Sequence, residues 1–159
     1  MRDSWRLMAA AIGIGALAGL RTMTAPAVVS WATERGWIRS PGRHLAFLGS
    51  KRTVAIISTL AAGELAVDKL PATPNRTVPA GLVARFVSGG LSAGVLCASK
   101  KKMVAPGVLL GGLAAIAGAF IGYSARRELR EKLHLSDAAI AVAEDALAAG
   151  GGVLLVHSL

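Results

Sequence analysis

Apolar residues form five long runs along the chain, and short stretches between the runs hold most of the charges. The runs lie at residues 7–31, 53–70, 79–99, 103–123 and 137–156. Each is close to the ~20 residues that a helix needs to cross the hydrocarbon core of a bilayer. Backbone groups in lipid must find their hydrogen bonds inside the protein, which favours helices. We therefore expect an all-α polytopic membrane bundle of about five spans, with residues 1–159 forming a single domain.

Residues at the ends of the runs support these limits. Pro79 suits the first turn of a helix, and Ser136 can accept a hydrogen bond at the start of the last one. Trp31, Trp37 and Tyr123 fall near predicted ends, where amphipathic rings favour the membrane interface.

The first run contains a predicted break between Gly19 and Pro26. Pro26 has no backbone N–H to donate, and Arg21 places a charge deep in an apolar segment. A kink, an unwound segment and a re-entrant loop all fit this pattern.

The break decides how the basic residues divide between the two membrane surfaces. If the first run crosses once, each surface receives eight Lys and Arg residues, a tie that a dual-topology protein would also show. If the chain turns back at Arg21 to Pro26, the division becomes ten against six. The second case predicts that Lys100, Lys101 and Lys102 lie in the cytoplasm.

Charged residues inside the runs are the candidates for function. Glu144 and Asp145 are adjacent within the last run, where burying a carboxylate costs about 2.5–3.5 kcal/mol even on lenient insertion scales. Counted from the nearest helix ends, Glu64, Arg85 and Glu144 each lie roughly 10 Å inside one surface at about 1.5 Å per residue. We therefore expect one charged layer.

Further charged residues extend this layer. Asp68 lies four residues after Glu64 on one helical face, and two such acids repel each other unless a cation, a proton or an arginine lies between them. Arg85 is the expected arginine, and Arg21 is placed to reach the same cluster. The full set of candidate ion-binding or substrate-binding residues is Arg21, Glu64, Asp68, Lys69, Arg76, Arg85, Glu144 and Asp145. The alternative is that these charges only pair with one another and fix helix packing.

Composition agrees with a membrane protein. The chain is 53% hydrophobic with only 4% aromatic residues, and its mean hydropathy is +0.55. The formal charge of +9 would suggest nucleic-acid binding in a soluble protein. Because the basic residues lie mostly between apolar runs, we expect contact with anionic lipid headgroups and no nucleic acid.

The run at residues 103–123 is rich in glycine. Gly107 with Gly111, and Gly118 with Gly122, have the small-xxx-small spacing that lets helix backbones approach closely. This spacing predicts tight packing within the chain or between copies, so a homo-oligomer through residues 103–123 is a possible assembly.

The motifs of soluble enzymes are missing from the sequence. It contains no phosphate loop, no H-E-x-x-H and no G-x-S-x-G. Cys97 is the single cysteine, and the three histidines are scattered, so we expect no cofactor, no metal and no catalytic residues. The hypothesis of an enzyme acting on lipid headgroups rests only on Asp68, Lys69 and Arg76 near the surface. No obvious nucleophile or histidine base accompanies them.

One string resembles a known family. Residues 64–77, read as E-x3-D-K-x-P-x2-P-x-R-T, are similar to the signature of a bacterial membrane family called domain of unknown function 4126. Gly19-Leu20-Arg21, Thr24-Ala25-Pro26 and Glu144-Asp145-Ala146 resemble that family too, as does Arg85. The resemblance implies an all-helical integral protein of the bacterial inner membrane and supplies no activity.

These observations favour a small transporter or channel in which the buried charges form a site for an ion, a proton or a small solute. The alternative is a non-transporting scaffold or lipid-interaction protein, in which the charges lock helix packing.

Overall fold

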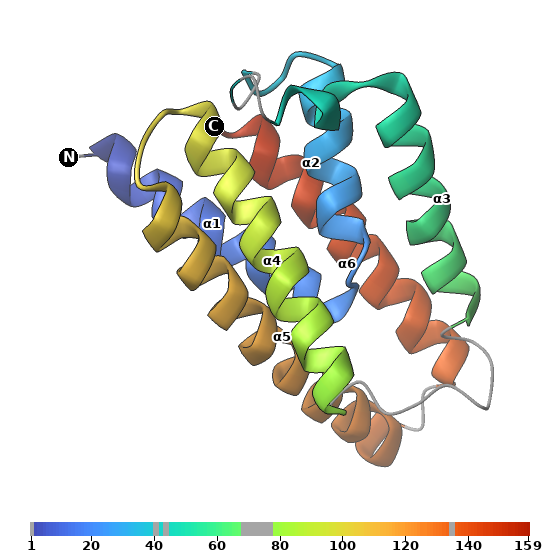
Figure 1. The fold of residues 1–159 in the computed structure, drawn as a ribbon. Coiled ribbons are helices and arrows are strands. Elements are labelled where there is room, and N and C mark those ends of the chain that lie inside the picture. Colours follow the sequence, from blue (N-terminus) through green and yellow to red (C-terminus); the bar gives the residue numbers. More distant parts are fainter. Residues whose placement is uncertain (1, 40–41, 43–44, 68–77, 134–135) are drawn as a thin grey trace.

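The computed structural model describes residues 2–39, 42, 45–67, 78–133 and 136–159. Within these residues the regular structure is entirely helical, which confirms the expected all-α fold (Figure 1). The elements are α1 (Arg2–Leu20), α2 (Thr24–Glu34), the short 3₁₀ helix η1 (Ala46–Gly49), α3 (Lys51–Val67), α4 (Pro79–Ser99), α5 (Val104–Leu133) and α6 (Asp137–His157).

The helix ends follow the local signals. Pro79 opens α4, where a missing N–H costs nothing, and the Ser136 hydroxyl accepts a hydrogen bond from Ala139 N at the start of α6. The α5 helix continues past Tyr123 to Leu133, so the charged stretch after residue 123 is a helical extension.

Three helices in the described part of the chain have the length and apolar character needed to cross a membrane. They are Pro79–Ser99, Val104–Lys132 and Ala139–His157. Outward-facing apolar side chains fit this environment: Ile121 is 67% exposed on α5 and Leu154 is 72% exposed on α6. The helices are therefore compatible with a membrane protein whose outer surface contacts lipid.

The first apolar run is a re-entrant hairpin made of α1 and α2. Arg6, near the start of α1, lines a pocket together with Ser158 and Leu159 at the end of the chain. The Trp37 ring, just after α2, lies 5.2 Å from the ring of His157 at the end of α6. Both outer ends of the hairpin thus lie at one end of the bundle (Figure 1). Among the three forms that the sequence allows, the chain adopts the one that turns back.

Close glycine contacts hold α1, α4 and α5 together. A Cβ atom added at Gly15 would lie 2.2 Å from Gly111 O, and one added at Gly111 would lie 2.4 Å from the Ala93 Cβ. Added at Gly118, it would lie 2.3 Å from Ala16 O. The predicted small-residue packing therefore occurs within the chain. On the other side of this unit, α2 packs against α6 and α3.

Candidate functional site

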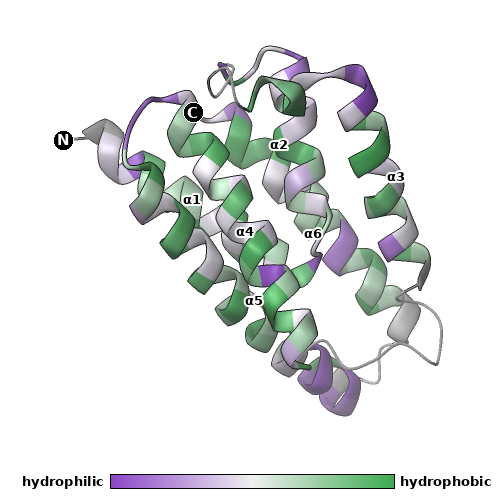
Figure 2. Ribbon diagram, in the orientation of Figure 1, coloured by the Kyte–Doolittle hydropathy of each residue, from purple (hydrophilic) through white to green (hydrophobic). Residues whose placement is uncertain are grey.

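Polar groups gather inside the bundle where α1 gives way to α2. Figure 2 shows hydrophilic positions at this junction and in the middle parts of α4 and α6, surrounded by hydrophobic ones. The α1 helix ends at Leu20 and α2 begins at Thr24, so the link between them leaves the regular helical hydrogen-bond pattern.

Pro26 explains one part of the break. In a continuous helix the N–H of residue 26 would donate to Thr22 O, but proline has no N–H. The Ser88 hydroxyl of α4 donates to Thr22 O instead. Since both Ser88 and Thr22 are buried, this hydroxyl replaces a bond that water does not supply.

Glu64 and Arg85 together replace a second helical bond. In a continuous helix, Met23 N would donate to Gly19 O. Here Met23 N donates to Glu64 Oε2 at 2.7 Å, and Gly19 O accepts from Arg85 Nε at 3.1 Å. An acid from α3 therefore binds the donor, and a base from α4 binds the acceptor, of one interrupted helical hydrogen bond.

Glu64 also caps the start of α2. Its Oε1 accepts from Thr22 N at 2.7 Å, so each carboxylate oxygen binds one backbone N–H. A negative charge at this position is stabilised by the positive end of the α2 dipole, and charged hydrogen bonds of this kind are stronger than neutral ones.

Arg21 links the break to α6. Its Nη2 atom lies 2.6 Å from Asp145 Oδ1, and the Arg21 side chain is 0% exposed, against 20% for Asp145. Burying a guanidinium is tolerated only beside a compensating negative charge. Arg21 therefore orients the link toward Asp145.

Glu144 pairs with a different arginine. Arg126 Nη2 of α5 lies 2.7 Å from Glu144 Oε2. Adjacent residues on a helix point about 100° apart, which explains why Glu144 and Asp145 face separate partners. Arg126 precedes the end of α5 by seven residues, and Glu144 follows the start of α6 by seven, so the two lie at equal depth.

The structure brings together four of the predicted residues, Arg21, Glu64, Arg85 and Asp145, at the break. Within the described part of the chain, no ion pair joins Glu64 to Arg85. Glu64 accepts from two backbone N–H groups of the link, while Arg85 Nε donates to Gly19 O near the end of α1. Glu144 lies beside this group on α6. Asp68, Lys69 and Arg76 lie outside the described residues.

Sequence reasoning did not assign roles to Arg126, Ser88 or Thr22. Arg126 lies in the charged stretch after the fourth run, and its position seven residues before the end of α5 places it at the depth of Glu144. Ser88 gave no usable signal, since serine is common in membrane helices and often bonds its own backbone.

A groove gives access to one member of the site. It lies between α2, α3 and α6 with a volume of about 310 Å³, and its lining includes Thr24, Ser58 and Asp145. Asp145 is the charged side chain among its described lining residues. Among all described residues, no three His, Cys, Asp or Glu side chains are grouped to hold a metal ion.

Comparison with known proteins gives a family and no named relative. Neither the curated proteins nor the solved structures include a significant match to the chain. The profile of one family matches residues 8–158, nearly the full length, and it is the family suggested by the sequence motifs. The chain therefore belongs to the family described as Domain of unknown function (DUF4126).

Proposed function

We propose that the protein is a small membrane transporter or channel whose site for a proton, an ion or a small solute is the Arg21–Asp145 pair. The position of Asp145 carries the proposal. One of its oxygens meets a fully buried guanidinium, while its side chain remains 20% exposed and lines the groove between α2, α3 and α6. A carboxylate placed between a buried cation and an open groove can exchange its partner for a proton or a cation.

The broken helix supports the same function. Transporters often bind substrates where a membrane helix is interrupted, because the ends of the two half-helices present unpaired backbone groups. In this chain the N-terminal end of α2 already holds an anion, the Glu64 carboxylate. The site is thus of a kind that binds charged groups.

We further propose a multi-pass protein of the bacterial inner membrane with both described termini on the cytoplasmic side. The hairpin supports this topology, because nine basic positions of the described residues then share the surface that holds the α4–α5 connection and four share the other. The nine are Arg2, Arg6, Arg35, Arg39, Lys51, Arg52, Lys100, Lys101 and Lys102. Anionic lipids would contact this surface.

A homo-oligomer through α5 is also proposed, with a changed contact face. Gly111 and Gly118 already pack against α4 and α1 within the chain. Contact between copies would therefore use the outward face of α5, where Leu109 and Leu113 are each 58% exposed.

Flux through reconstituted protein tests the transport proposal. Proteoliposomes with fluorescent reporters for protons, Na⁺ and K⁺ should show flux above empty liposomes, and Asp145→Asn should lower the flux at least about tenfold by removing the exchangeable charge. Ala149→Phe, which fills the groove while keeping every charged residue of the site, should have the same effect.

Two matched controls complete this experiment. Ala146→Phe adds the same bulk at an exposed α6 position outside the groove lining, and Glu131→Gln removes an acid that is 60% exposed on α5. Both should retain wild-type flux. Wild-type protein without flux for any of the three ions, or an Ala149→Phe variant with full flux, would argue against the proposal.

A second function, a non-transporting scaffold, is favoured by one observation. Glu64, Arg85 and Ser88 direct polar atoms to backbone groups at the end of α1 and in the α1–α2 link, as expected of residues that hold a fold together. This function predicts no flux in the same proteoliposomes.

A further inference from the structure

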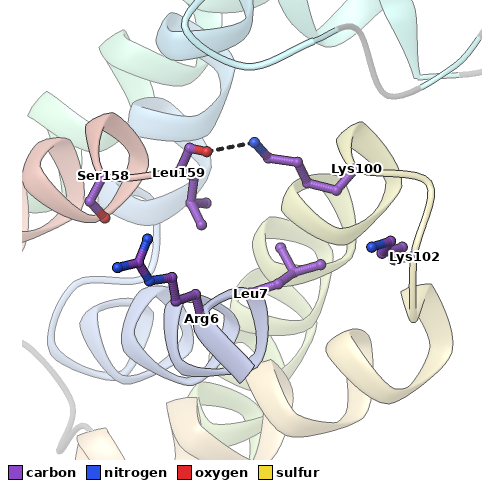
Figure 3. A pocket seen from close by; sticks show the side chains of 6 residues that line it. All are labelled: Arg6, Leu7, Lys100, Lys102, Ser158 and Leu159. Carbon is purple, nitrogen blue, oxygen red and sulfur yellow. Dashed lines mark hydrogen bonds between the residues drawn. The ribbon is translucent and has the colours of Figure 1, made fainter. Parts of the chain in front are cut away.

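A basic pocket lies at the end of the bundle opposite the charged layer. It has a volume of about 220 Å³ and is lined by Arg6, Leu7, Lys100, Lys102, Ser158 and Leu159 (Figure 3). These residues come from the start of α1, the α4–α5 connection and the end of the chain after α6. Three cationic side chains from two separate segments therefore line this pocket.

The positive charge of the pocket is only partly compensated. Lys100 Nζ donates a hydrogen bond to Leu159 O at 2.6 Å. In the part of the chain that the structure describes, Arg6 and Lys102 have no ion-pair partner, and the described lining contains no acidic side chain. Like charges held around one hollow repel each other, and an anion between them would offset that repulsion.

The α4–α5 connection holds its lysines in a fixed turn. Lys101 N donates to Ala98 O at 2.9 Å, and Lys102 N donates to Cys97 O at 3.0 Å. Lys101 and Met103 have φ angles of 54° and 50°, in the left-handed region. That region costs a residue other than glycine roughly 1–2 kcal/mol. The surrounding bonds therefore maintain a turn that an unconstrained chain would avoid.

Exposed tryptophan side chains lie at the same end of the bundle as the pocket. Leu7 in its lining is 3% exposed, while Trp5 is 66% exposed, and Trp37 near the same end of the bundle is 39% exposed. Exposed tryptophans at helix ends mark the membrane interface. A planar guanidinium together with ammonium groups is a combination that binds phosphate.

We propose that this pocket binds the phosphate group of an anionic phospholipid. Arg6 and Lys102 supply the main contacts. The site is separate from the Arg21–Asp145 pair, and it stands whether or not the protein transports a solute.

Native mass spectrometry of the purified full-length protein with phosphatidylglycerol tests the site. The double variant Arg6→Gln/Lys102→Gln should retain phosphatidylglycerol roughly 30-fold more weakly than wild type, from about fivefold per lost basic residue. Lys51→Gln/Arg52→Gln removes two exposed charges outside the pocket lining and should change retention less than about twofold. Zwitterionic phosphatidylcholine should bind weakly to both double variants.

Three results would overturn the proposal. Equal losses in the two double variants would mean that only total charge matters, and no loss in either would mean that the pocket is not a lipid site. The third is a thermal stabilisation by inorganic phosphate that requires Arg6 and Lys102 while phosphatidylglycerol retention does not. That result would assign the pocket to a soluble phosphate.

Discussion

Replacing Glu64 with leucine is expected to destabilise the protein by about 2–6 kcal/mol, at about 1–3 kcal/mol for each of two backbone N–H groups that lose their acceptor. Those groups, Thr22 N and Met23 N, each lie 2.7 Å from a Glu64 oxygen. Water is not available to replace the carboxylate inside a membrane. Thermal unfolding in detergent, followed by circular dichroism, should show a midpoint lower by roughly 5–20 °C.

The matched control is Glu131→Leu. Glu131 pairs with Arg127 on a part of α5 where both side chains are more than half exposed, so its loss should change stability by less than about 0.5 kcal/mol. A Glu64→Leu variant that unfolds together with this control would show that the carboxylate does not hold the break.

Removing either partner of the Arg21–Asp145 pair is also expected to lower the stability of the protein strongly. Asp145→Leu removes the carboxylate 2.6 Å from a guanidinium that is 0% exposed, and breaking a buried pair in this way costs about 3–5 kcal/mol. Arg21→Met leaves Asp145 without the guanidinium and should destabilise the protein as well. The double variant should recover much of the loss, because neither buried charge then remains.

A double-mutant cycle in unfolding experiments measures this coupling. The exposed pair Arg127–Glu131 provides the reference, with an expected coupling of about 0.3–0.5 kcal/mol. Additive losses at Arg21 and Asp145 would mean that the two side chains do not stabilise each other.

Much of the fold could be predicted from local signals. The spacing of apolar runs predicted the helices, and Pro26 with Arg21 predicted the break. The direction of the chain after the break could not be predicted, because proline and arginine only end α1. The turn depends on Glu64, Arg85 and Ser88, which reach the link from helices distant in the sequence.

The depth of the charged side chains in the bundle could be predicted, but not which of them pair with one another. Counting residues from helix ends placed Glu64, Arg85 and Glu144 in one layer, since rise along a helix is fixed. Which side chains meet depends on how each helix is rotated about its axis. For α1, α4 and α5 that rotation is set by glycine contacts such as Gly15 with Gly111. In the folded chain Glu64 and Arg85 face backbone atoms, and Glu144 faces Arg126.

The re-entrant hairpin determines on which side of the membrane each later helix begins, and cysteine labelling in sealed membrane vesicles tests it. The natural Cys97 is buried and would be replaced by alanine. Single cysteines would then be placed at Ser4 before the hairpin, at Arg35 after it, at Lys101 between α4 and α5, and at Glu131 near the end of α5.

A membrane-impermeant thiol reagent should label the first three positions from the same side of the membrane and Glu131→Cys from the other. This result follows from a chain that turns back between Leu20 and Thr24. Labelling of Ser4→Cys and Arg35→Cys from opposite sides would mean that the first apolar run crosses the membrane, and it would contradict the hairpin.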